Sequence, residues 1–167
     1  MSVCILDNIE KQIEALITNM SIDDGFNYNW SIINEEDEAI GDFPRAIIDP
    51  RDSFSDKESS RDTLAGIGSN DYTNEVMFTI LVTGSLVNFS ENPSFAIRSN
   101  LRRALDDLKQ LFGIHNQLQG TCDNIMYVGS QQEPVRKNDV MSAANLRTVW
   151  KVIYSQDRII PSQYASS

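Results

Sequence analysis

The order in which hydrophobic periodicities follow one another constrains this chain more than any single motif does. A helical period comes first, then two short strand-like runs, a polar acidic stretch, a long alternating run, a second helical period and two more strand-like runs. Apolar residues repeating every three to four positions indicate a buried helix face, whereas strict alternation indicates a half-buried strand. The sequence therefore predicts an α+β fold. No spacing of His, Cys, Ser or carboxylates requires a particular chemistry.

Two segments have the apolar spacing of amphipathic helices. The first is expected at residues 3–20, with an apolar face of Leu6, Ile9, Ile13, Leu16, Ile17 and Met20. The second opens with Asn92-Pro93, a pair that favours a helix start, and Gly113 fits its end. Its buried stripe is expected to contain Ile97, Leu101, Ala104, Leu105, Leu108 and Phe112. Its polar face is either a docking surface or a solvated face, and carries Arg98, Arg102, Arg103, Lys109, Asp106 and Asp107.

Five runs are expected to be strands. Large apolar and small polar side chains alternate over residues 26–32. One face carries Phe26, Tyr28, Trp30 and Ile32, and this row is expected to belong to the core. An aromatic row of this kind could also stack on bases or sugars. Prolines near both ends of residues 43–50 place that strand at a sheet edge. Residues 72–87 have two apolar faces, typical of a central strand, and predict a ribbon that extends past the sheet and bends at Gly84. The last two strands are expected at residues 124–129 and 146–154.

The length of 167 residues suits one ordinary domain, and 41% hydrophobic content supplies a packed core. We expect a single α+β domain over residues 1–158 and a C-terminal arm over residues 159–167. Residues 51–71 and 131–145 are polar without apolar periodicity, and are expected to be long loops. Loops of this kind could become ordered against a neighbouring subunit.

The charge balance limits the class of partner. A net charge of −10 argues against a free-standing nucleic-acid binder, because the phosphate backbone favours a basic surface. The acidic surface either repels DNA, meets a basic partner or only aids solubility. Cys4 and Cys122 have no metal-ligand spacing and are expected to be free thiols. No apolar run approaches the ~20 residues of a membrane helix. The N-terminal residues lack a signal-peptide pattern, so a cytoplasmic site of synthesis and use is expected.

Three candidate catalytic features are weaker than their structural interpretations. His115 is the single histidine and lies in a polar connector, so it is a poor candidate for a catalytic base. Half of the carboxylates lie between Glu35 and Glu75 and could hold Mg²⁺ for phosphodiester hydrolysis, but the lysine that such a nuclease places near the metal is missing. The glycines of residues 66–69 lack the lysine of a phosphate-binding loop. We expect no enzyme activity, cofactor or metal site.

The order of elements resembles that of the tail terminator, or tail-completion, proteins of tailed bacteriophages. The matching pieces cover most of the chain: the N-terminal helix ending near Gly25-Phe26, the strand Phe43–Ile48, the strand Val76–Val82, the helix with Leu101, Leu105 and Leu108, the strand Ile125–Gly129, and the closing strand Leu146–Tyr154. These are patterns rather than signatures. The resemblance implies a mainly antiparallel sheet of about four to five strands packed against two α-helices. The long extended loops and the C-terminal arm exceed what a minimal member requires.

What the resemblance implies is a structural virion protein rather than an enzyme. Such proteins form a homo-hexameric ring on the finished tail tube, stop its polymerisation and offer the surface to which the filled head attaches. The implied partners are the tail tube protein and a neck or head–tail connector protein, with assembly in the host cytoplasm and no membrane contact. DNA passes through the ring without specific binding, and an acidic lumen would repel its phosphates. The candidates to face that lumen are Glu35, Glu36, Asp37, Glu38, Asp56 and Glu58.

Three alternatives stay open at the level of sequence. One is a neck or head–tail connector protein of similar size, which differs in the surface that it caps. Another is a small α+β ligand-binding domain whose pocket is lined by Phe26, Tyr28 and Trp30. The third is the Mg²⁺ nuclease, whose activity would be lost when Glu35–Glu38 are replaced by alanine.

Overall fold

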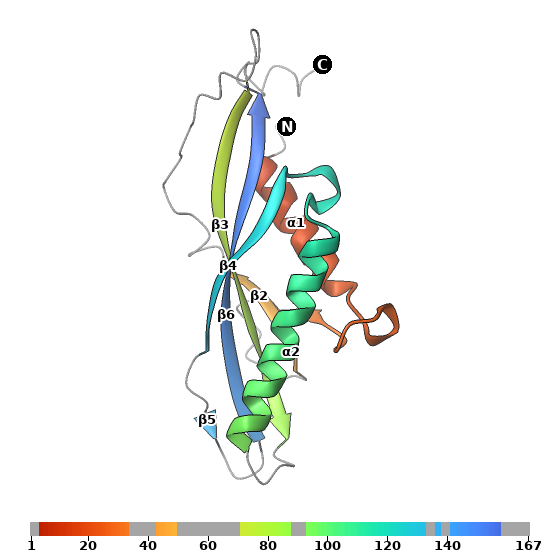
Figure 1. Cartoon of the computed structure of the whole chain (residues 1–167), viewed down its shortest axis with the longest axis vertical. Helices are drawn as coiled ribbons and strands as arrows, with labels where there is room; N and C mark the ends of the chain where they lie inside the picture. Colours follow the sequence, from red (N-terminus) through yellow and green to blue (C-terminus); the bar gives the residue numbers. More distant parts are fainter. Residues whose placement is uncertain are drawn as a thin grey trace.

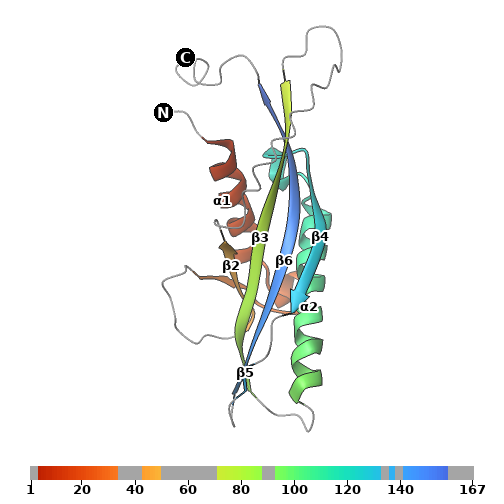
Figure 2. The ribbon, with the colours of Figure 1, turned by 90° about the vertical axis from the view of Figure 1, so that its left-hand side faces the viewer.

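The chain folds into two layers, a twisted sheet and two helices that cover one of its faces. The computed structural model describes residues 4–33, 43–49, 71–87, 93–132, 136–137 and 141–157. Figure 1 shows the helices α1 (Ile5–Thr18) and α2 (Pro93–Ile114) together on one side of the long strands. In Figure 2 the strands lie in front and the helices behind, so this view looks onto the face of the sheet that the helices leave uncovered.

The sheet is mixed but mainly antiparallel. Its strands follow the order β1-β2-β3-β6-β4, and a short β5 pairs with β6 beside this path. Their bounds are β1 Ser31–Ile32, β2 Arg45–Asp49, β3 Asp71–Val87, β4 Asn124–Gln132, β5 Arg136–Lys137 and β6 Met141–Asp157. The pairing of β1 with β2 is parallel, and the other strand pairs are antiparallel. The predicted α+β fold is thus confirmed.

The β3–β6 ribbon is the longest element of the fold. Its register runs without interruption from Asp71 opposite Asp157 to Val87 opposite Met141. On its outer edge β3 meets β2 between Thr79 and Thr83, while β6 meets β4 between residues 146 and 153. The ribbon therefore extends past β2 and β4 at both ends, as the sequence predicted (Figure 1).

Gly84 lies where β3 passes close to the segment that precedes β2. A Cβ built on Gly84 would lie 2.6 Å from the Cα of Phe43, and Gly84 has a φ of +153°. Glycine is required here because any side chain would displace the Phe43 backbone.

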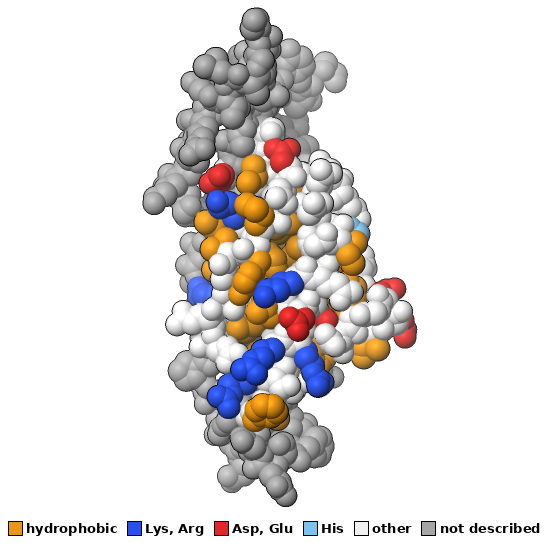
Figure 3. All heavy atoms as spheres, viewed as in Figure 1, with side chains coloured by type: hydrophobic (Ala, Val, Ile, Leu, Met, Phe, Trp, Pro, Cys, Tyr) orange, Lys and Arg blue, Asp and Glu red, His pale blue; other side chains and the backbone are white. Residues whose placement is uncertain are grey.

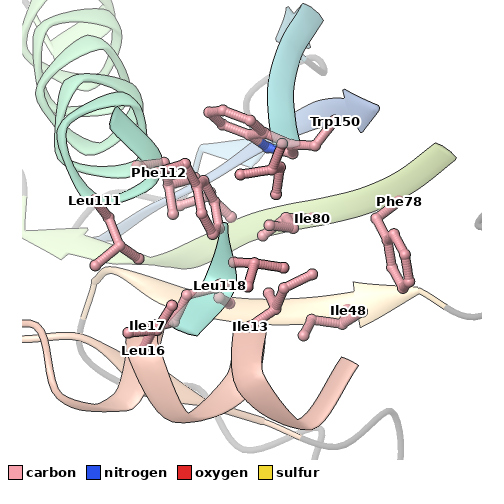
Figure 4. Packing of buried hydrophobic residues seen from close by; sticks show 14 of the residues in the cluster. Ile13, Leu16, Ile17, Ile48, Phe78, Ile80, Leu111, Phe112, Leu118 and Trp150 are labelled. Atoms are coloured by element: carbon pink, nitrogen blue, oxygen red, sulfur yellow. The ribbon is translucent and has the colours of Figure 1, made fainter. Parts of the chain in front are cut away.

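The core lies between the helices and the covered face of the sheet. The alternating residues of β3 that the sequence assigned to one face, Val76, Phe78, Ile80 and Val82, are all buried. Figure 4 shows Ile13 and Ile17 of α1, Phe112 of α2 and Trp150 of β6 converging on the same interior. Leu118, from the short 3-10 helix η2 (Leu118–Gly120), fills the space between them. Both predicted helix stripes are buried, with Leu105 and Leu6 at the margin.

The predicted strand at residues 26–32 is wrong. Residues 26–30 are irregular, and only Ser31 and Ile32 pair with β2. Another short 3-10 helix, η1 (Ile22–Asp24), precedes this segment. Its backbone and Trp30 find their hydrogen-bond partners on α2 and at Met20, so no neighbouring strand is needed. The aromatic row still packs inward, with Trp30 buried and Phe26 and Tyr28 packed against the core.

Two further predictions need correction. The strand at residues 43–50 is not at an edge, because β1 pairs with β2 on the side away from β3. The loop predicted at residues 131–145 is largely strand, since β4 continues to Gln132 and β6 begins at Met141. These parts of β4 and β6 are polar, so they lack the apolar alternation by which strands are recognised from sequence. The loop at residues 51–70 and the arm at residues 159–167 lie outside the described residues.

Candidate interaction surface

The outer face of α2 is basic although the whole chain is acidic. Arg98, Arg102, Arg103 and Lys109 are all exposed, and the nearby Phe95 ring is also exposed. Figure 3 shows these cationic side chains gathered over α2, with apolar side chains over the neighbouring strand. Half of the chain's carboxylates lie between Glu35 and Glu75, so positive and negative charges are concentrated in different segments. The predicted polar face of the second helix is therefore exposed, as a docking surface requires.

The edge strand β4 presents three consecutive apolar side chains to solvent. Met126, Tyr127 and Val128 are 38%, 36% and 52% exposed. No residue of β4 is charged. Soluble proteins usually protect edge strands with charged residues, prolines or bulges, and β4 uses only the last of these, an irregularity between Tyr127 and Gly129.

The basic face and the apolar strand form one continuous surface. The Nζ atom of Lys109 lies 4.4 Å from the centre of the Tyr127 ring, a cation–π geometry that joins α2 to β4. The Tyr127 ring in turn meets Trp150, which packs against Phe112 with ring centres 4.7 Å apart. The Tyr127 hydroxyl donates to the Ser130 hydroxyl at 2.8 Å. Contacts with Trp150, Ser130 and Lys109 thus fix the Tyr127 ring, so this part of the surface is ordered before any partner binds.

The face of the sheet opposite the helices is partly apolar. Alternation places Met77 and Leu81 of β3 and Val149 of β6 on this face, each half-buried. Lys151 lies on the same face and forms an ion pair with Glu75 at 3.7 Å. Both members of this pair are partly exposed, so the pair contributes little to stability. A sheet with one face covered by helices and the other partly apolar suits a protein that meets a partner.

Asp107 fixes the irregular segment between η1 and β1 to α2. Its carboxylate is fully buried and accepts four hydrogen bonds. The donors are the backbone and side-chain amides of Asn27, both at 2.8 Å, the backbone N–H of Tyr28 at 3.2 Å and the indole N–H of Trp30 at 3.0 Å. A buried carboxylate is tolerated only when its oxygens are satisfied in this way. Asp107 is therefore an anchor within the fold, and its exposed neighbour Asp106 is free of that role.

The residues first considered for chemistry do not meet at one place. His115 follows the end of α2, and its backbone N–H donates to Leu111 at 2.9 Å. Cys122 is buried with its thiol directed at the carbonyl of Asn116, while Cys4 is exposed. Burial, with the nearby Asp123 carboxylate, raises the pKa of Cys122 to about 11, so its thiol stays protonated at neutral pH. Among the described residues, no three His, Cys, Asp or Glu side chains gather as metal ligands would.

The acidic residues proposed for the lumen, and the glycines at residues 66–69, lie outside the described residues. Within the described part, neither helix is long and apolar enough to cross a membrane. No known protein-family model matches this chain, and no curated protein matches it at a significant level.

Two features of this region were missed by sequence reasoning. The exposed run at β4 was predicted only as a short strand, and its edge position could not be recognised without the strand order. The sequence places Asp107 on the polar face of the second helix, whereas the structure buries it. A signal was present, since Asp107 lies three residues after Ala104 and four before Leu111, both of which are buried.

Proposed function

We propose that this protein is a non-enzymatic structural component of a phage virion, a ring that caps the tail tube. The carrying observation is the uncharged edge strand β4, with its exposed apolar side chains, next to the basic face of α2. An uncovered, partly apolar sheet face and a free edge favour protein–protein assembly. The order of elements that resembles tail terminator proteins gives this assembly its specific form, a homo-hexamer that stops tube polymerisation.

The net charge of −10 supports the same proposal. In a ring through which DNA passes, an acidic lumen prevents the phosphate backbone from adhering. We propose that the acidic residues at 35–38, 56 and 58 face this lumen. The basic face of α2 is suited to meet an acidic surface of a neighbour or of the tail tube.

The first test is negative-stain electron microscopy of the purified protein at high concentration, together with sedimentation velocity. Six-fold rings with a central hole wide enough for duplex DNA would support the proposal. Compact two-fold dimers that bind one small molecule per chain would contradict it and favour the ligand-binding domain. Cleavage of DNA in the presence of Mg²⁺ would also contradict it, if replacement of Glu35–Glu38 by alanine abolished that cleavage.

A tail terminator and a neck or head–tail connector protein would both give rings, so a second measurement must separate them. The purified protein is added to tail tube protein from the same virus while the tubes are polymerising. A terminator shortens the tubes and decorates one end, whereas a connector leaves tube length unchanged. The same reaction with a variant carrying Arg98→Glu and Arg102→Glu tests whether the basic face contributes to tube binding.

A further inference from the structure

Within the described part of the chain, no strand pairs with the outer edge of β4, and this edge is suited to receive another strand. Its described neighbour on that side is the loop after α2, where the Ile125 N–H donates to the Asn116 carbonyl at 2.9 Å. From Met126 onward no described strand pairs with this edge, and no charge on β4 opposes pairing. Free backbone groups flanked by exposed apolar side chains are the features that edge-to-edge association uses.

A second edge that no described strand fully covers lies on the other side of the same ribbon. The described strand that borders the outer edge of β3 is β2, which pairs only with Thr79–Thr83. Residues 71–78 of β3 therefore have β6 on one side and no described strand on the other. This stretch contains Glu75, which an uncharged β4 would not repel.

The two free edges lie at overlapping levels along the ribbon. Within these two edges, β6 residues 150–151 pair with β3 at residues 77–78 and with β4 at residues 126–127. Both β3 and β4 are antiparallel to β6, so they run parallel to one another. Rotation about an axis along the strands preserves strand direction, and the stagger of tilted strands shifts the register between copies. A neighbouring copy can therefore present its β3 edge to β4 in parallel orientation.

We infer that the outer edge of β4, from Met126 onward, pairs with the outer edge of β3, residues 71–78, in the next copy of the chain. The contact is heterologous, since it joins two different surfaces, and repeated rotation closes it into a ring. Every copy then buries one apolar β4 edge, and one continuous sheet runs around the assembly. This inference rests on the proposed ring and specifies how the ring closes.

The test uses a lysine placed at the edge and a matched control elsewhere. Met126→Lys and Val128→Lys introduce the charge that protected edge strands carry. Ile22→Lys is the control, because Ile22 is 57% exposed and lies in η1, away from both edges. Sedimentation velocity should show at least a tenfold weaker assembly for the two β4 variants and wild-type assembly for the control. Equal thermal unfolding midpoints establish that all three variants fold.

Cross-linking identifies the partner edge. In a Cys4→Ser background, one variant carries Val128→Cys and another carries Met77→Cys, and the two are mixed with a short bismaleimide. Cross-linked dimers are expected in the mixture and not in either variant alone. A chain carrying both cysteines should give a ladder of products that ends at the hexamer.

The outcomes separate this inference from the proposed function. Rings that form as well in Met126→Lys and Val128→Lys as in Ile22→Lys overturn the edge pairing and leave the ring function standing. Efficient cross-linking of Val128→Cys to itself means a two-fold contact, which overturns both. A wild-type chain that stays monomeric at every concentration overturns the pairing, and tube capping then tests the function by itself.

Discussion

Replacing Asp107 by alanine should destabilise the protein strongly, because this one carboxylate accepts hydrogen bonds from a buried indole N–H and from part-buried amides. Trp30 is buried and its indole N–H donates to Asp107, as does the part-buried backbone N–H of Tyr28. A buried donor left without an acceptor costs about 1–3 kcal/mol. Two such donors give a loss of about 4 kcal/mol in the free energy of unfolding. The amides of Asn27, an exposed residue, can bind water and add little.

The same substitution at Asp106 provides the control. Asp106 is adjacent on α2 but exposed, so Asp106→Ala should change stability by less than about 0.5 kcal/mol. Both variants gain the same helix propensity, which cancels in the comparison. Urea unfolding followed by tryptophan fluorescence gives the two free energies. For a chain of this size, a loss of about 4 kcal/mol in the free energy of unfolding lowers the thermal unfolding midpoint by roughly 8–16 °C.

Asp107→Asn tests the reasoning at finer resolution. The amide oxygen can keep two of the four hydrogen bonds, but the NH₂ group then faces two donors and cannot accept from them. An intermediate loss is expected. If the free energies of unfolding of Asp107→Ala and Asp106→Ala differ by less than about 1 kcal/mol, the Asp107 carboxylate is not the anchor of this segment.

Three further predictions concern the packing of the sheet and the state of one thiol. Gly84→Ala should lower the free energy of unfolding by at least about 2 kcal/mol, because its Cβ would lie 2.6 Å from the Phe43 backbone. Gly113→Ala, whose Cβ would meet nothing within 4 Å inside α2, should raise it by about 0.5–1 kcal/mol. Urea unfolding measures both changes, and the reverse order would contradict the close approach at Gly84. Thr148→Val should lower the free energy of unfolding by about 2 kcal/mol and Thr148→Ser by much less. The reason is that the buried Thr148 hydroxyl accepts from the Trp150 indole N–H at 2.9 Å and donates to the Ile80 carbonyl at 2.8 Å. Equal urea unfolding midpoints for the two variants would refute this. At pH 8, iodoacetamide should label the exposed Cys4 and spare the buried Cys122, as mass spectrometry can show. The free energy of unfolding should fall as the pH rises from about 9 towards about 11, because the unfolded chain loses the Cys122 proton at a lower pH than the folded protein does. Labelling of both thiols in the folded protein would contradict the raised pKa.

Local patterns predicted the helices and the central ribbon because each carries a complete signal within its own sequence. The stripe of α2 and its Asn92-Pro93 start are local features, and so is the alternation of Val76, Phe78 and Ile80 in β3. The error at residues 26–30 has a nonlocal cause. An alternating sequence there has its backbone satisfied by Asp107, which lies far along the chain, instead of by a strand.

The candidate interaction surface was predicted in part. Exposure of Arg98 and Arg102 followed from helical periodicity, because the apolar stripe occupies the opposite side of α2. The importance of β4 did not follow from its sequence. Met126, Tyr127 and Val128 would be ordinary core residues in a central strand, and they become a candidate docking edge only because β4 is the last strand of the sheet.

By itself, the sequence determined the α+β composition, the two amphipathic helices, the long central strand and the acidic character of the chain. These properties depend on spacing and composition, which are written along the chain. The tertiary structure decided the strand order, the parallel pairing of β1 with β2, the burial of Asp107 and the position of β4 as the last described strand of its sheet. Those properties depend on which distant segments become neighbours, and hydrogen bonding across the sheet, rather than local preference, selects them.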